Sequence, residues 1–145
     1  MRRWLPTALI PVAFVAGLTV SAKAPTGAVV STADAPTRVA PSGKASVTLF
    51  TPHDTEGNAF FALLHLDGGA KVPLHKDESE ELIYILEGGG EIWIDGAAHT
   101  VGPGHAVIMP PNAEVRFEGG AAPTKVLQVF APATSAAKYA GWTAQ

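Results

Sequence analysis

The stretch GAKVPLHKDESEELIYILEG, residues 69–88, decides the predicted fold. Its first half carries His75 and Asp77 two positions apart, and its second half contains the apolar run 82–86. Alternate residues of an extended strand point to the same face. We therefore expect His75, Asp77 and, after a bend in the chain, Glu81 to point into one cavity.

Short apolar runs and turns alternate through most of the chain. Glycine, proline and asparagine lie between the runs, and three consecutive glycines occupy positions 88–90. The predicted strands are residues 45–51, 59–66, 82–86, 91–94, 105–109, 115–117 and 125–130. Several short strands at near-regular spacing predict an all-β sandwich or barrel. No helix start signal precedes a 3.6-residue apolar pattern, so residues 133–141 are expected to form one helical turn at most.

Composition excludes several classes of function. The 145 residues are 47% apolar and 16% charged, which is typical of one folded domain and not of a disordered polymer. There is no cysteine, so disulfides, thiolate metal sites and cysteine nucleophiles are excluded. The net charge is −3 without a basic cluster, so no nucleic-acid partner is expected. Neither a Gly-x-Ser-x-Gly motif nor a phosphate-binding glycine loop before a helix is present.

The first 22 residues have the three parts of a secretory signal peptide. Two arginines precede an apolar run, and small residues follow it, with the preferred cleavage site after Ala22. We therefore expect a bacterial-type signal peptide, export to the periplasm or the medium, and no stable membrane insertion after cleavage. The alternative is an uncleaved anchor, although the run holds two prolines and is shorter than the roughly 20 residues of a spanning helix.

The rest of the chain divides into three predicted parts. Residues 23–44 are rich in Ala, Pro, Thr, Ser and Gly, which indicates a flexible linker or arm. A short edge strand is expected inside this arm at residues 29–32. The folded domain is predicted to span residues 45–131, and residues 132–145 form a C-terminal extension.

Residues 69–88 resemble the first sequence motif of the cupin superfamily. That motif reads Gly, five residues, His-x-His, three residues, Glu, six residues, Gly. Gly69, His75, Glu81 and Gly88 fall in register with it. Asp77 takes the place of the second histidine.

A later stretch, GHAVIMPPNAEVRFEG, begins at Gly104 and is similar to the second cupin motif. That motif reads Gly, five residues, Pro-x-Gly, two residues, His, three residues, Asn. Gly104 and Pro110 match, and Asn112 replaces the glycine, which is acceptable because asparagine also tolerates a left-handed backbone. Val115 stands at the histidine position, and Gly119 stands at the asparagine position.

The resemblance implies a small single-domain cupin of the type-2 kind, with a double-stranded β-helix, the cupin jelly-roll barrel. Family members often hold one divalent metal with three histidines and one glutamate. In this chain the metal-ligand candidates are His75, Asp77 and Glu81, with His65 in reserve. Such a set suits a divalent transition metal, namely Fe, Mn, Zn or Ni.

A metal-free barrel is the alternative. His75 and Glu81 would then bond to each other, to backbone groups or to water, and Asp77 would lie in a solvated acidic loop. In either state we expect a ligand-binding pocket that includes His75, Glu81 and Gln128, because a polar Gln128 inside an apolar strand needs a partner.

The sequence is compatible with three functions. The first is an exported cupin that binds a small polar molecule in its barrel, with or without a divalent metal. The second is a metal-dependent cupin enzyme, an oxidoreductase such as a dioxygenase or an isomerase. The third is a non-catalytic envelope protein that contacts a partner. The resemblance also implies a homodimer, and His53, His99 and His105 are expected in turns or on the surface.

Overall fold

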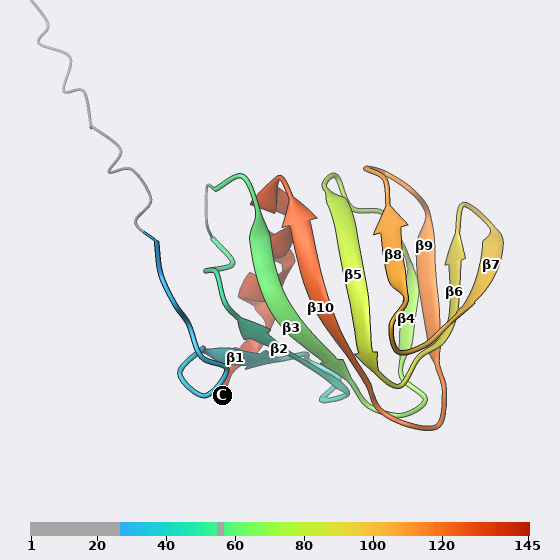
Figure 1. The fold of residues 1–145 in the computed structure, drawn as a ribbon, viewed down its shortest axis with the longest axis horizontal. Helices are drawn as coiled ribbons and strands as arrows, with labels where there is room; N and C mark the ends of the chain where they lie inside the picture. The colour runs from blue at the N-terminus through green and yellow to red at the C-terminus, as the bar shows by residue number, and fades with distance from the viewer. Residues whose placement is uncertain (1–26, 55–56) are drawn as a thin grey trace, which may run out of the picture.

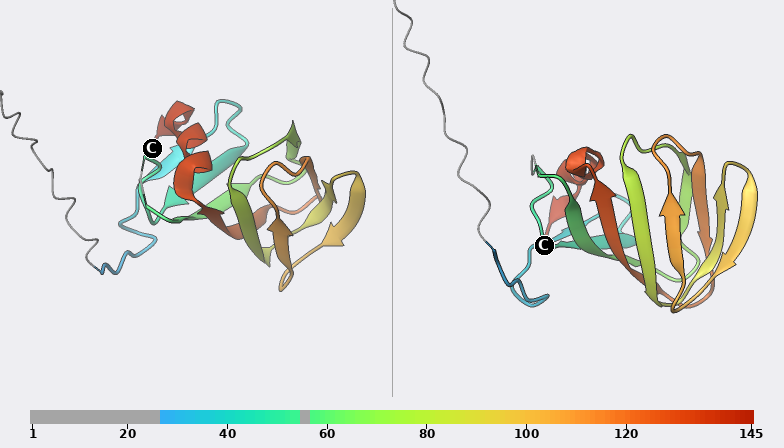
Figure 2. Two further views of the ribbon diagram at one scale, coloured as in Figure 1. Left: turned by 90° about the horizontal axis from the view of Figure 1, so that it is seen from above. Right: turned by 45° about the horizontal axis from the view of Figure 1, so that its top comes forward.

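The computed structural model describes residues 27–54 and 57–145, and the predicted signal peptide lies outside them. These residues form two antiparallel sheets that face each other, in the orders β11-β1-β2-β3-β10-β5-β8 and β4-β9-β6-β7 (Figures 1 and 2). The strands are β1 (Thr37–Val39), β2 (Ala45–Leu49), β3 (Phe60–Leu66), β4 (Lys71–His75), β5 (Glu80–Glu87), β6 (Gly90–Ile94), β7 (Ala97–Val101), β8 (Ala106–Met109), β9 (Val115–Gly119), β10 (Thr124–Ala131) and β11 (Thr143–Ala144). The predicted all-β jelly-roll fold is confirmed.

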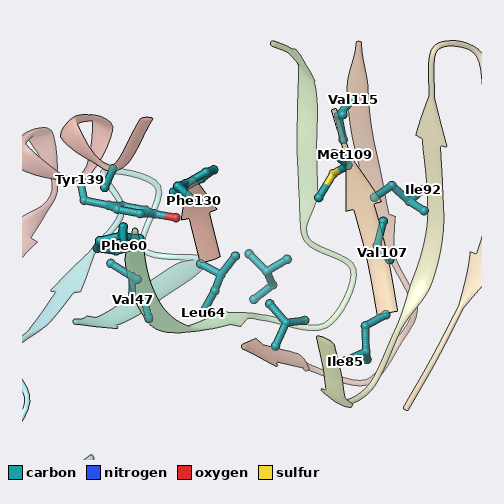
Figure 3. Close-up of a cluster of buried hydrophobic side chains, with 14 of the residues drawn as sticks. Val47, Phe60, Leu64, Ile85, Ile92, Val107, Met109, Val115, Phe130 and Tyr139 are labelled. Atoms are coloured by element: carbon teal, nitrogen blue, oxygen red, sulfur yellow. The ribbon is translucent and has the colours of Figure 1, made fainter. Parts of the chain in front are cut away.

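Alternating side chains explain why the two sheets pack together. In β10, which pairs with both β3 and β5, every second residue is buried and the residues between are half-buried. The inward side chains form one core that extends from Tyr139 and Phe60 at one end to Met109 and Val115 at the other (Figure 3). Complete burial of a side chain such as Phe60 contributes about 1.5 to 3 kcal/mol to folding.

The C-terminal extension forms a helix, η1 (Ala133–Gly141), which is a 3-10 helix of nine residues. The expectation of one helical turn at most was wrong. The buried residues of η1 are Ala133, Ala136 and Tyr139, and this spacing of three matches the three residues per turn of a 3-10 helix. A search for the α-helical period of 3.6 misses such a pattern. The ring of Tyr139 stacks on Phe60 of β3, with 5.6 Å between ring centroids, which fixes η1 against the larger sheet.

The prediction of a short strand at residues 29–32 was also wrong, because the structure has no strand there. Ser31 Oγ donates a hydrogen bond to Asp34 Oδ2, and the amide of Asp34 donates to Ser31 Oγ, so a turn forms there. The strand of this region is β1, which pairs with β2 on one side and with β11 on the other. The predicted arm therefore adds a strand to the sheet. Within residues 27–54 and 57–145, no helix is long and apolar enough to cross a membrane.

Two motif glycines, Gly69 and Gly88, provide a test of the fold. Both have positive φ angles, 69° and 72°, but a Cβ on Gly88 would lie 2.1 Å from the carbonyl oxygen of Pro123, whereas a Cβ on Gly69 meets nothing within 4 Å. We expect Gly69→Ala to lower the free energy of unfolding by about 1 to 2 kcal/mol, the cost of the left-handed backbone. Gly88→Ala should lower it by more than about 3 kcal/mol, because backbone atoms must also move. Urea denaturation measures both, and equal losses would contradict the packing described for Gly88.

Candidate functional site

The turn from β4 to β5 brings three predicted ligands together. His75 ends β4 in the smaller sheet, Asp77 lies in the connecting loop, and Glu81 lies near the start of β5 in the larger sheet. Each offers a ligand atom, and these atoms all lie within 4.8 Å of one another. The group therefore sits where the chain crosses from one sheet to the other.

The ring of His75 is held by its own strand. Its Nδ1 lies 2.9 Å from the carbonyl oxygen of Pro73. A carbonyl only accepts hydrogen bonds, so Nδ1 carries the proton and donates it. In the neutral ring the lone pair is then on Nε2, which lies 3.6 Å from Asp77 Oδ2. A lone pair on the ring nitrogen that faces a carboxylate is the state that a metal requires of histidine.

Glu81 is buried inside the barrel, with 6% of its surface exposed. Gln128 Nε2 donates to Glu81 Oε1 at 2.5 Å, and Tyr139 Oη donates to Gln128 Oε1 at 2.6 Å. Burial raises the pKa of the Glu81 carboxyl above its usual range, and the Lys138 ammonium and the Gln128 hydrogen bond offset this only in part. Gln128 thus lies next to the predicted ligand Glu81.

Tyr139 determines which way the buried amide faces. Burial, with the negative charge of Glu81 adding to it, raises the pKa of the Tyr139 phenol, so the hydroxyl keeps its proton and acts as a donor. The amide oxygen of Gln128 must then face Tyr139, and its NH₂ group must face Glu81. Three elements, η1, β10 and β5, are joined in this way by one chain of buried hydrogen bonds.

A lysine that the sequence analysis did not single out completes the cluster. Lys138 of η1 extends to Asp77, with its Nζ 2.7 Å from Asp77 Oδ2, and it also lies 4.5 Å from the centroid of the Phe130 ring. The Asp77 side chain is 15% exposed, so it is not the solvated loop residue of the metal-free alternative. The site contains two carboxylates, one imidazole and one ammonium group.

The reserve ligand His65 is not brought to the site. The inward residues of β3 are the even-numbered ones, so His65 lies on the outer face, where its Nε2 is 3.5 Å from Asp67 Oδ1. Of the other histidines, His99 is exposed on β7 and His53 is half-buried in a loop. His105 is exposed in a turn, where its Nδ1 accepts the amide hydrogen of Gly102 at 2.9 Å.

Val115 lies directly across from His75 on the neighbouring strand β9, and it is buried. Directly opposite residues of an antiparallel pair have their side chains on the same face. Val115 therefore faces the same side of the smaller sheet as His75 and offers no ligand atom. This position agrees with the register in which Val115 replaces a motif histidine.

The donor set suits a divalent metal. One imidazole nitrogen and two carboxylates are ligands for Mn or Fe, and a set with a histidine also accepts Zn or Ni. Three protein ligands leave coordination positions for water or for a bound molecule. The three donors and their hydrogen-bonded supports therefore fit a metal centre in which the protein does not fill every coordination position.

Comparison with known proteins supports the fold. Residues 62–130 match a family model described as "Cupin domain". The chain is 39% identical over 61 residues to the uncharacterized protein MJ1618 of Methanocaldococcus jannaschii, an alignment that covers 41% of this chain and 49% of that protein. The chain thus spans about half the length of the curated relative it matches.

Solved structures are similar over a longer part of the chain. KdgF from Halomonas sp. matches with a TM-score of 0.64 and 18% identity, over 74% of this chain and 94% of that one. The polyketide cyclase RemF from Streptomyces resistomycificus matches with a TM-score of 0.63 and 20% identity, over 73% of this chain and 80% of that one. A predicted oxalate decarboxylase from Thermotoga maritima matches with a TM-score of 0.61 and 23% identity, over 72% of this chain and 99% of that one. At these identities the likeness is one of fold.

The buried hydrogen-bond chain predicts a specific loss of stability. Tyr139→Phe keeps the ring on Phe60 but leaves the buried oxygen of Gln128 without its donor. We expect the free energy of unfolding to fall by about 1 to 3 kcal/mol, measured by urea denaturation. Tyr84→Phe is the control, because Tyr84 is 47% exposed, and it should change the stability little. Equal stability of Tyr139→Phe and the wild type would contradict the hydrogen-bond chain.

Proposed function

Because this chain belongs to the cupin superfamily, we propose that its barrel holds a divalent metal through His75, Asp77 and Glu81 and binds a small polar molecule beside it. The observation that carries this proposal is the approach of the three ligand atoms to within 4.8 Å of one another. Exposed acidic groups often cluster without a metal, but here Glu81 is buried and the imidazole orientation is fixed by Pro73.

The chemistry of the site favours an oxygen donor as the bound molecule. When bound, a divalent metal supplies a positive charge that holds and polarises a hydroxyl or carboxylate oxygen. The chain's own contribution is to orient the His75 ring and to hold the Glu81 carboxylate through Gln128. On the side of Val115 the site is bordered by a buried apolar side chain. The signal-like residues 1–22 support action outside the cytoplasm.

A metal-dependent oxidoreductase or isomerase is the second candidate. The count of three protein ligands favours it, because a substrate oxygen needs a free coordination position on the metal for catalysis. The two candidates differ in turnover and not in the metal ligands. Loss of the bound molecule's signal over time, by NMR with the metal-loaded protein, would indicate an enzyme, whereas an unchanged bound molecule indicates a binding protein.

The proposed ligands predict which substitutions abolish metal binding. His75→Ala and Glu81→Gln should each weaken binding of Mn²⁺ by more than about 100-fold, since a supporting residue alone is worth about 10- to 100-fold. Glu81→Gln keeps the side-chain shape and still accepts a hydrogen bond from Gln128. Titration calorimetry and the metal content of untagged protein measure the effect. His99→Ala, on exposed β7, should leave binding unchanged, and equal affinity of all variants would contradict the assignment.

Val115→His tests whether position 115 can supply a fourth metal ligand beside His75, Asp77 and Glu81. The new imidazole would face the site from directly opposite His75, so we expect tighter metal binding by about tenfold or more. Four-ligand zinc sites bind with about 10 to 16 kcal/mol in total, so one added ligand has a measurable effect. Calorimetry with Zn²⁺ and Mn²⁺ checks this. A folded variant with no gain for either metal would contradict the placement of Val115 beside the site.

A further inference from the structure

The ammonium group of Lys138 contacts a carboxylate that is also a candidate metal ligand. Its Nζ lies 2.7 Å from Asp77 Oδ2, and this is the same oxygen that lies 3.6 Å from the free ring nitrogen of His75. A metal that joins His75 Nε2 to Asp77 Oδ2 would approach the oxygen that Lys138 already contacts. Lys138 lies 61 residues from Asp77 in the sequence, so η1 brings the two together.

We infer that Lys138 is a built-in cation that competes with the divalent metal for Asp77 and thereby sets the metal affinity of the site. This inference rests on the proposed function, because it concerns the regulation of the same site. In the metal-free protein Lys138 is paired with Asp77. In the metal-loaded protein we expect it to leave Asp77.

The charges of the cluster support this competition. Asp77 and Glu81 offer two negative charges when ionised, and Lys138 supplies one positive charge. The Lys138 charge acts on Glu81 as well as on Asp77, since it is the main influence that lowers the Glu81 pKa against burial. The carboxylates of the metal-free site therefore have a partner. An incoming metal must both displace that partner and tolerate its positive charge nearby.

When Lys138 leaves Asp77, its ammonium group still has aromatic rings and solvent nearby. The Lys138 side chain is 37% exposed, and its Nζ already lies 4.5 Å from the centroid of the Phe130 ring and 6.0 Å from that of Tyr139. An ammonium group over aromatic rings and open to water keeps a favourable environment. Meanwhile η1 is anchored by the buried side chains of Ala133, Ala136 and Tyr139. Metal binding therefore requires a rotation of one side chain, not a movement of the helix.

The test is titration of Mn²⁺ into the purified, untagged protein, with calorimetry as the readout. Lys138→Met keeps the aliphatic stem and removes the charge, and we expect it to bind Mn²⁺ at least about tenfold more tightly than the wild type, the scale of one hydrogen bond to a charged group. Lys138→Arg retains the charge and should stay close to the wild type. Lys125→Met is the matched control, because Lys125 is 35% exposed and pairs with Glu87 at 2.9 Å, outside the metal-ligand group.

The outcomes separate the inference from the proposed function. Equal Mn²⁺ affinity of Lys138→Met and the wild type, with binding still lost in His75→Ala, would overturn the inference and leave the proposed function in place. Absence of binding in the wild type, Lys138→Met and Val115→His would overturn both. If Lys138→Met does not fold, Lys138→Gln takes its place in the same comparison.

Thermal unfolding gives a second readout. Without metal, Lys138→Met should have a lower Tm than the wild type, because Asp77 then lacks its ammonium partner. Saturating Mn²⁺ should then raise the Tm of Lys138→Met by more than it raises that of the wild type. A smaller rise in the variant would count against the inference.

Discussion

The carboxylate of Glu81 lies inside the barrel, away from water. The site depends on the hydrogen bond and the nearby positive charge that stabilise it there. A buried carboxylate without partners costs several kcal/mol, so its neighbours cannot be chosen freely. Gln128 donates to it, Tyr139 donates to Gln128, and Lys138 supplies a nearby positive charge. These three residues come from β10 and η1, so the larger sheet and the C-terminal helix are both linked to one buried carboxyl group.

The same constraint explains the place of η1 in the fold. Two of its three buried residues, Ala133 and Ala136, are small and bury little apolar surface. Tyr139 adds a ring stacked on Phe60 and a hydroxyl that completes the buried hydrogen-bond chain. Lys138, next to it, faces the β4–β5 loop instead. One turn of helix therefore contributes to the core, to the support of Glu81 and to the charge of the site.

The strand pattern and the two motifs at residues 69–88 and 104–119 predicted the fold, and residues 75–81 predicted the meeting of His75, Asp77 and Glu81, because motif spacing and strand alternation are local properties. Gln128 was predicted to need a partner, since a polar residue in an apolar strand stands out, and it has two in Glu81 and Tyr139. Its place in a ligand-binding pocket stays a prediction. The ion pair of Lys138 and the hydrogen bond of Tyr139 were missed because both depend on η1 folding back onto β10 and the β4–β5 loop. His65 was misplaced as a reserve ligand, because residue alternation alone does not say which face of β3 is the inner one.

We propose that a divalent metal binds between His75, Asp77 and Glu81 and displaces Lys138 from Asp77. Crystals of the protein soaked in Mn²⁺ and measured near the manganese absorption edge would reveal both events. We predict an anomalous peak within bonding distance of His75 Nε2 and both carboxylates, with the Lys138 ammonium turned away from Asp77. A map without a peak at this position, in which Lys138 still contacts Asp77 Oδ2, would contradict it.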